Sequence, residues 1–255
     1  MQDDNFHVFS LFSGSRGNGI YITCGDTRIL VDAGLCAKSV RSAIAGVDRP
    51  DVLPDAIFVT HEHSDHVKGI PILSRTVPVH MIEDCAPFIT CDLTHRHVHP
   101  SLFTQTVGCM EVTSFVTPHD SHGSVGYVIR MPGHSVGIAT DLGYLPGGIL
   151  GLLCTCDAVV LESNYDEDML RTGRYPYSLK QRILSDYGHL SNRDCAEGVR
   201  VLCGAGVQNI LLSHLSEENN TPTLAFRASS EAAEAVAGNR VRLAVADRIA
   251  PTRLV

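Results

Sequence analysis

The chain has no tryptophan, only 6% aromatic residues, and no run of about 20 apolar residues. A helix that crosses a bilayer needs such a run, so no membrane-spanning helix is expected. The first five residues, Met-Gln-Asp-Asp-Asn, lack the basic and apolar segments of a secretory signal. These absences predict a cytoplasmic protein that acts without a membrane.

Paired cysteine motifs and an excess of positive charge are also missing. The nine cysteines include no CxxC pair, and several lie in apolar segments, which predicts reduced, mostly buried thiols. The formal net charge of −8 argues against a broadly basic nucleic-acid surface, although it leaves room for a local positive site. No linker or repeat divides the 255 residues, so residues 1–255 are predicted to form a single domain.

Apolar, β-rich segments occur in two groups, each followed by helical segments. This order predicts the α/β class, with two sheets face to face and helices outside them. We expect strands at 6–12, 19–24, 27–31, 55–60, 77–82, 108–116, 124–131, 135–140, 157–162, 209–213 and 240–246. We expect helices at 35–44, 67–74, 149–153, 177–187, 192–205 and 222–237.

Histidine is abundant, with 13 in the chain, and one segment concentrates it. The string His61-Glu62-His63-Ser64-Asp65-His66 offers four potential metal ligands in six residues, directly after a buried strand. Residues 61 and 63 of an extended loop can project the same way, while 65 and 66 turn toward a second point. Imidazole with carboxylate suits Zn, Mn, Fe or Ni better than Ca.

Three further potential ligands each follow an apolar strand. They are His119, Asp141 and His214. Loops at strand ends gather at one edge of a sheet, where sites of α/β proteins are expected. His122 is an alternative to His119, which is preferred because it follows its strand directly. Asp32 also follows a strand and could orient a ligating histidine.

This HxHxDH string with a later His, Asp and His resembles the metallo-β-lactamase superfamily, from Phe6 to about Ala225. The resemblance implies a four-layered αβ/βα sandwich with two divalent metal ions, of which Zn is the first expectation and Mn or Fe are alternatives. One ion would be held by His61, His63 and His119, and the other by Asp65, His66 and His214. Asp141 would bridge them, together with a shared hydroxide.

The C-terminal half is similar to the tRNA 3′-processing endonucleases, in which a Glu–His pair delivers a proton to the leaving oxygen. Glu162 and His189 match that pair, although Leu190 is a poor match to the central serine of the motif. The long arm that grips tRNA is absent from the sequence. The YycJ/WalJ-like branch, described as 5′→3′ exonucleases on DNA, is the better overall match. It shares segments 10–18, 31–34, 162–165, 188–192 and 213–219.

The resemblance assigns three catalytic roles and the sequence suggests a substrate-binding set. Asp65 would orient the hydroxide, His189 would protonate the leaving oxygen, and Glu162 would hold His189. A Gly/Ser loop and a helix start offer donors for phosphate. The substrate-binding candidates are Ser15, Arg16, Asn18, Ser191 and Asn192. The alternating histidines of 95–99 are expected to lie in a solvated loop.

These expectations combine into a dinuclear phosphodiesterase that degrades DNA from a 5′ end, with no obligate protein partner. The alternative is a thioester or small-ester hydrolase of the glyoxalase II type. A Glu–His proton donor argues against that alternative, because a thiolate leaves without an acid. The length of the chain leaves no room for the flavin domain of flavodiiron proteins, and the full set of seven candidate ligands disfavours a mononuclear dioxygenase.

Overall fold

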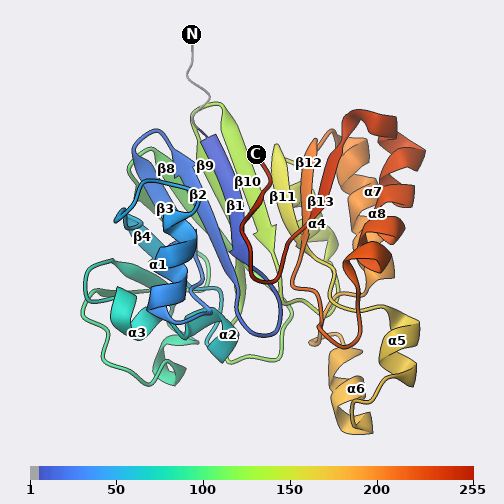
Figure 1. Cartoon of the computed structure of the whole chain (residues 1–255), viewed down its shortest axis with the longest axis horizontal. Helices are drawn as coiled ribbons and strands as arrows, with labels where there is room; N and C mark the ends of the chain where they lie inside the picture. Colours follow the sequence, from blue (N-terminus) through green and yellow to red (C-terminus); the bar gives the residue numbers. More distant parts are fainter. Residues whose placement is uncertain (1–5) are drawn as a thin grey trace.

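The computed structural model describes residues 6–255, apart from the side chain of Asn239, so residues 1–5, in which no secretory signal is expected, lie outside the described residues. Two seven-stranded sheets face each other, and helices cover their outer faces (Figure 1). This is the predicted α/β sandwich. No helix within residues 6–255 is both long and apolar enough to cross a membrane.

The first sheet has the order β14-β1-β2-β3-β4-β5-β6. Its strands from β14 to β3 are antiparallel, and those from β3 to β6 are parallel. The hairpin between β2 and β3 turns at Gly25, whose φ is +57°, as the Gly-Asp sequence predicts. The strands are β1 (Phe6–Phe12), β2 (Gly19–Cys24), β3 (Thr27–Val31), β4 (Ala56–Phe58), β5 (Val79–Ile82), β6 (Arg96–His99) and β14 (Thr252–Arg253).

The second sheet has the order β13-β12-β11-β10-β9-β8-β7. Here β10 to β13 are parallel, and β7 to β10 are antiparallel. The strands are β7 (Thr104–Val107), β8 (Met110–Val116), β9 (Val125–Met131), β10 (His134–Ala139), β11 (Ala158–Glu162), β12 (Asn209–Ser213) and β13 (Arg242–Val245).

Helices complete the four layers. α1 (Ala37–Ala45), α2 (Ser64–Val67) and α3 (Ile70–Leu73) lie on the side of the first sheet, whereas α4 (Gly147–Leu153), α7 (Asn192–Ala205) and α8 (Pro222–Ala237) cover the second (Figure 1). α5 (Glu167–Thr172) and α6 (Tyr177–Ile183) project below the second sheet. Two 3₁₀ turns are η1 (Ala86–Phe88) and η2 (Gly238–Arg240).

Two apolar cores hold the layers together. One fills the space between the sheets, with Tyr21, Phe58 and Tyr127 among its largest fully buried side chains. The other packs α4, α7 and α8 on the second sheet through residues such as Val199 and Leu212. Both sheets therefore have an apolar inner face, and the edges of the strands are left to carry polar groups.

Two expectations about local structure are wrong. The helix expected at 67–74 is two short helices, because the N–H of Gly69 bonds to the carbonyl of Ala33 and interrupts the helical ladder. His97 and His99 lie in strand β6 and not in a solvated loop, whereas His95 lies in the turn before that strand. The rings of His97 and His99 stack beside His80 of the neighbouring strand. β6 pairs on one side only, so its side chains are largely exposed and show no alternation of apolar residues.

The carboxyl ends of several strands meet along the lower edge of the sandwich in Figure 1. β3, β4, β10, β11 and β12 run parallel to their partners within the two sheets, so the residue after each strand reaches this edge. Three of those residues have left-handed backbones: Asp32 (φ 62°), Asp141 (φ 58°) and His214 (φ 57°). The turn out of each strand therefore aims a polar side chain across the edge.

Candidate metal centre

The segment from His61 to His66 leaves β4 as an extended loop and then enters α2. His61 and His63 lie before the helix, and Asp65 and His66 lie inside its single turn. The extended backbone and the helical turn thus send the two pairs toward different points, as the spacing predicts.

A first group of ligand atoms comes from His61, His63 and His119, all within 4.8 Å of one another. His61 is fully buried, and Nδ1 of His63 lies 3.4 Å from Nε2 of His119. The Nδ1 atom of His119 contacts the carbonyl oxygen of Gly188 at 3.1 Å, which turns its Nε2 atom toward the group.

A second group comes from Asp65, His66 and His214, again within 4.8 Å. The Oδ2 atom of Asp65 lies 3.5 Å from Nε2 of His66 and 3.5 Å from Nε2 of His214. Asp141 lies between the two groups, with one oxygen 3.4 Å from Nε2 of His66 and the other 3.8 Å from Nε2 of His119. All seven side chains expected to bind metal are therefore brought together.

The polar atoms of this cluster test whether metal ions fit it. His61 Nε2, His214 Nε2 and Asp141 Oδ2 are buried and have no hydrogen-bond partner among the described residues. A buried polar atom without a partner is costly, and such atoms usually bind a group of their own. Three converging unpaired atoms of imidazole and carboxylate type fit divalent metal ions.

The charges of the cluster also favour the binding of cations. Burial raises the pKa of Asp141, but His214 and His66 outweigh that effect and hold its pKa below the usual value. Burial lowers the pKa of His214, yet Asp141, Asp65 and Glu162 outweigh it and raise that pKa to about 10. The centre thus holds ionised carboxylates that attract positive charge, which divalent cations would supply.

The alternative ligand His122 lies outside the cluster. Its side chain is 55% exposed, its Nδ1 atom lies 2.8 Å from Oε1 of Glu62, and its ring stacks on Phe88. The geometry favours His119, which follows β8 and Pro118 directly.

Asp32 contacts the candidate ligand His66 at Nδ1, the ring nitrogen that is not directed toward the other candidate ligands. Its Oδ2 atom lies 2.8 Å from Nδ1 of His66, and its two oxygens accept from the backbone N–H and the hydroxyl of Thr60, each at 2.8 Å. Thr60 in turn contacts Nδ1 of His61 at 3.0 Å. Asp32 therefore fixes the orientation of one imidazole directly and of another through a hydroxyl.

We expect Asp32→Asn to weaken metal binding about 10- to 100-fold, because carboxylate partners of ligating histidines contribute on that scale. Competition with a fluorescent chelator measures this affinity. Asp157→Asn, at the opposite end of β11, is the matched control. Equal metal affinity in the two variants would show that Asp32 does not position His66.

The Gly/Ser loop of 13–18 is tied to the ligand segment by its backbone. The N–H of Asn18 bonds to the carbonyl of Asp65 at 2.8 Å, and the N–H of Gly34 bonds to the carbonyl of Asn18 at 2.9 Å. A Cβ atom on Gly34 would lie 1.6 Å from the carbonyl oxygen of Asp65, so only glycine allows this approach. The side chain of Asn18 bonds to Gly14 on both its oxygen and its nitrogen.

A cleft of about 420 Å³ opens onto the cluster, and it contains the expected proton donor. Nδ1 of His189 donates to Oε1 of Glu162 at 2.8 Å. The same oxygen lies 2.9 Å from Nδ1 of His214, and Oε2 accepts from the backbone N–H groups of Leu142 and Leu190. Glu162 is fully buried, so it holds a ligand candidate and the proton donor at once. The cleft is lined by Ser15, His63, Ser64, Asp65, Asp141, Arg182, His189 and His214.

The expected substrate-binding residues have different placements. Ser15 lines the cleft, and Arg16 is exposed but paired with Glu217 at 2.9 Å. Asn18, Ser191 and Asn192 are buried instead, with exposures of 7%, 1% and 5%. Ser191 caps α7 by accepting from the N–H of Asp194, and Asn192 bonds to Ser163 and Asn220. Ser191 and Asn192 are therefore directed into the protein, away from the cleft. Asn18 does not line the cleft either, but its Nδ2 atom lies 3.2 Å from Nε2 of His66 and 3.4 Å from Oδ2 of Asp65, among the candidate metal ligands.

Three residues near the site were not anticipated. Arg182 of α6 lines the cleft and pairs with Asp120, whose other oxygen lies 3.6 Å from Nε2 of His119. Asn164 donates to the carbonyl oxygen of His214 at 2.7 Å. Asp120 could have been predicted to lie near the site because it follows His119 in the sequence. Arg182 could not, because an arginine on an amphipathic helix is usually a solvent-exposed residue.

Comparisons with known proteins agree with this geometry. The family model for the beta-lactamase superfamily domain matches residues 27–215. Exodeoxyribonuclease WalJ of Streptococcus pneumoniae (serotype 2, strain D39) is 36% identical over 234 residues, which are 88% of this chain and 87% of that protein. Exodeoxyribonuclease YycJ of Bacillus anthracis is 36% identical over 239 residues, 89% of each chain.

Solved structures support the fold. The metallo-β-lactamase fold protein YhfI of Bacillus subtilis superposes with a TM-score of 0.73 at 20% identity, covering 98% of this chain and 100% of that one. The short form of human tRNase Z gives a TM-score of 0.64 at 16% identity, covering 98% and 99%. From its family match, its two relatives and its four-layered architecture, the chain belongs to the metallo-β-lactamase superfamily.

Proposed function

We propose that this protein is a metal-dependent nuclease that degrades DNA from a 5′ end. The observation that carries the proposal is the pairing of a seven-residue candidate metal centre with a buried Glu162–His189 pair, in one cleft. The two relatives named exodeoxyribonucleases support the choice of DNA and of an end-directed reaction.

Two divalent ions are proposed: His61, His63 and His119 would hold one, and Asp65, His66 and His214 the other. Asp141, whose oxygens lie near His66 and His119, would serve both. Such ions acidify bound water, neutralise a phosphodiester and stabilise the charge that develops during its hydrolysis. Zn is the first candidate, and Mn or Fe are alternatives with the same donor preferences.

The residues of the chain supply orientation and a proton. Asp65, with a side chain 21% exposed toward the cleft, accepts a hydrogen bond from the attacking water and orients it. His189 has its Nδ1 atom engaged by Glu162, so Nε2 of the protonated ring is left to donate to the departing oxygen. Arg182 and Ser15 line the same cleft and contact the non-bridging phosphate oxygens.

The glyoxalase II-type alternative gains no support from these contacts. A thiolate is a good leaving group and needs no proton, so a histidine held by a buried carboxylate has no task in thioester hydrolysis. An alkoxide leaving from a phosphodiester does need one.

A substrate panel tests the proposal. The protein loaded with Zn or Mn is incubated with a 5′-phosphorylated 20-nucleotide single strand, the matching duplex, the RNA equivalent and a glutathione thioester. We expect DNA to be the preferred substrate. A label on the 5′ end should be released first, as a mononucleotide, whereas strands labelled on the 3′ end should become shorter step by step. Preferential thioester hydrolysis, or internal cleavage before the ends are lost, would contradict the proposal.

A further inference from the structure

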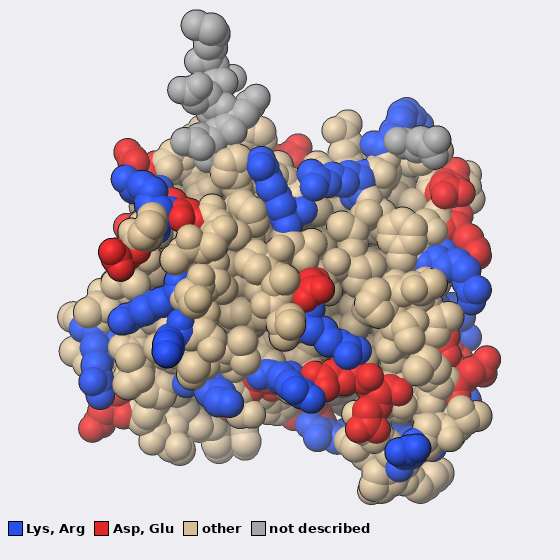
Figure 2. Space-filling model, in the orientation of Figure 1, with Lys and Arg blue, Asp and Glu red and all other residues tan. Residues whose placement is uncertain are grey.

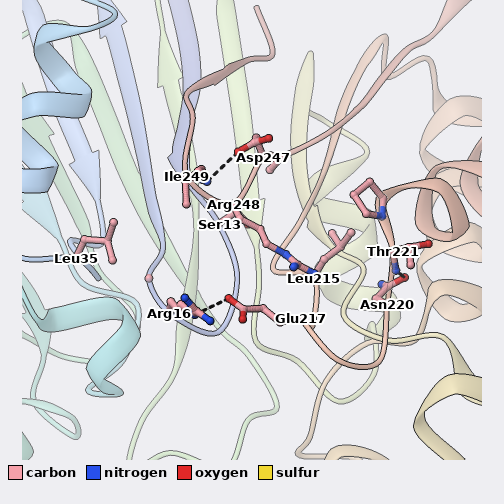
Figure 3. A pocket seen from close by; sticks show the side chains of 13 residues that line it. Ser13, Arg16, Leu35, Leu215, Glu217, Asn220, Thr221, Asp247, Arg248 and Ile249 are labelled. Carbon is pink, nitrogen blue, oxygen red and sulfur yellow. Dashed lines mark hydrogen bonds and ion pairs between the residues drawn. The ribbon is translucent and has the colours of Figure 1, made fainter. Parts of the chain in front are cut away.

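A cavity of about 670 Å³ lies beside the metal centre and is not used by the chemistry described above (Figure 3). Its volume falls within the range of ligand pockets in proteins. The lining comes from the 13–17 loop, the segment after His214, the start of α8 and the segment that joins β13 to β14. The lining includes Ser13, Arg16, Leu35, Leu215, Arg248 and Ile249.

The cavity and the metal cleft share their walls. Ser15 lines the cleft, and the next residue, Arg16, lines the cavity. His214 lines the cleft, and Leu215 lines the cavity. The hydroxyl of Ser13, in the cavity lining, accepts from the N–H of His214 at 2.7 Å. The loop of 13–17 and the segment 214–215 therefore contribute to both the cleft and the cavity.

The walls of the cavity are mainly apolar. Leu35, Leu215 and Pro222 form its sides, and Ile249 stands at its rim with 86% of its surface exposed. Figure 3 shows Leu35 on one side and Leu215 and Thr221 on the other. An apolar lining with a few polar groups is the usual composition of a pocket for a small organic ring, and a nucleobase has two apolar faces that such side chains can contact.

The cavity lining holds two cations and two carboxylates, and Arg248 is the cation without an ion pair within residues 6–255. Arg16 is paired with Glu217 at 2.9 Å, and the Asp247 carboxylate accepts from the N–H groups of Ile249 and Ala250, each at 2.9 Å. Arg248 donates to the carbonyl oxygen of Ser216 at 3.2 Å and forms no ion pair among the described residues. Figure 2 shows basic side chains spread over this face, together with a group of acidic side chains gathered below its centre.

We propose that this cavity binds one unpaired nucleobase of the DNA strand adjacent to the cleaved phosphodiester, with Arg248 on the neighbouring phosphate. The inference rests on the proposed nuclease function and adds a substrate preference to it. A base enters the cavity only after it leaves its stack, so single-stranded or frayed ends are preferred over closed duplex ends.

Two variants test the cavity. Ile249→Glu places a negative charge at the exposed rim, and Arg248→Ala removes the unpaired cation. Each should raise KM for a 5′-phosphorylated 20-nucleotide single strand about tenfold with kcat unchanged, the scale of one lost stacking or phosphate contact. Arg75→Ala, also exposed, is the matched control. Turnover of bis(p-nitrophenyl) phosphate should be unchanged in all three, because this small diester occupies only the cleft.

A second measurement uses the unmodified protein. An abasic residue is placed at successive positions from the 5′ end of the same strand, and one position should raise KM about tenfold. That penalty should disappear in Ile249→Glu, since the base contact is already lost.

The outcomes separate the two proposals. If the metal-loaded protein hydrolyses neither DNA nor the small diester, the nuclease function is wrong. If it degrades DNA but the variants and the abasic series match the controls, the cavity does not bind a base. Equal effects of the variants on single strands and on closed duplexes would indicate a site for backbone phosphates, which also overturns the proposal.

Discussion

Replacing His189 with alanine is expected to lower kcat for DNA about 10²- to 10⁴-fold, the usual contribution of a positioned general acid. The effect falls on kcat because the proton is transferred only as the oxygen departs. Metal content should stay at the wild-type value, since His189 is not in either proposed ligand set. Turnover of the 20-nucleotide strand and metal analysis of the same sample measure both quantities.

The leaving group gives this experiment an internal control. A p-nitrophenolate leaves without a proton, so His189→Ala should hydrolyse bis(p-nitrophenyl) phosphate nearly as fast as the wild type. His122→Ala, outside the cluster, should match the wild type on both substrates. An equal loss on the two diesters would show that His189 acts on the metal centre rather than as an acid. Glu162 is a poorer target, because its Oε1 atom contacts His214 as well as His189.

Replacing Asp141 with alanine is expected to abolish metal-dependent hydrolysis and to reduce bound metal below two ions per chain. Asp141 is buried, and its two oxygens face ligand atoms of both groups, so no other side chain can take its place. Metal should also cease to stabilise the fold. A ligand at 100 times its Kd adds about 2.7 kcal/mol, or about 5–10 °C in Tm for a chain of this size. Metal analysis and thermal unfolding with and without Zn measure these effects.

Asp51→Ala is the matched control for Asp141→Ala. Asp51 is also an aspartate with a left-handed backbone, with φ 65°, but it is exposed and lies before β4, away from the centre. Any effect of placing alanine in that conformation appears in both variants, whereas loss of metal appears only at Asp141. Retention of two ions and of the metal-induced rise in Tm by Asp141→Ala would refute its bridging role.

One physical reason explains why the sequence predicts both the two-sheet sandwich and the residues that lie in the candidate metal centre. Parallel strands deliver their carboxyl ends to a common edge, so a polar residue directly after an apolar strand has a predictable position. Asp32 and His214 directly follow their strands, Asp141 and His61 come within three residues of theirs, and the structure brings all four to the same edge. Their roles as ligands remain predictions that the Asp141 and Asp32 experiments test.

Other features depend on contacts that no local pattern encodes. Asn18, Ser191 and Asn192 have the residue types of a phosphate site, but tertiary packing uses their polar atoms inside the protein. Arg182 reaches the cleft only because α6 folds back under the second sheet. Strand β6 was missed because its exposed side chains carry no apolar period, and its pairing with β5 is a non-local interaction.

The left-handed backbones of Asp32, Asp141 and His214 have an evolutionary consequence. Each such conformation costs of the order of 1–3 kcal/mol for a residue with a side chain, whereas glycine adopts it without that cost. Asp32, Asp141 and His214 therefore give the metal-free chain a lower free energy of unfolding than glycine would at the same positions. A lineage released from the need to keep this candidate metal centre would gain stability by changing these three positions first. Substitution there, with the rest of the sandwich retained, would mark a descendant that has kept the fold and given up the reaction.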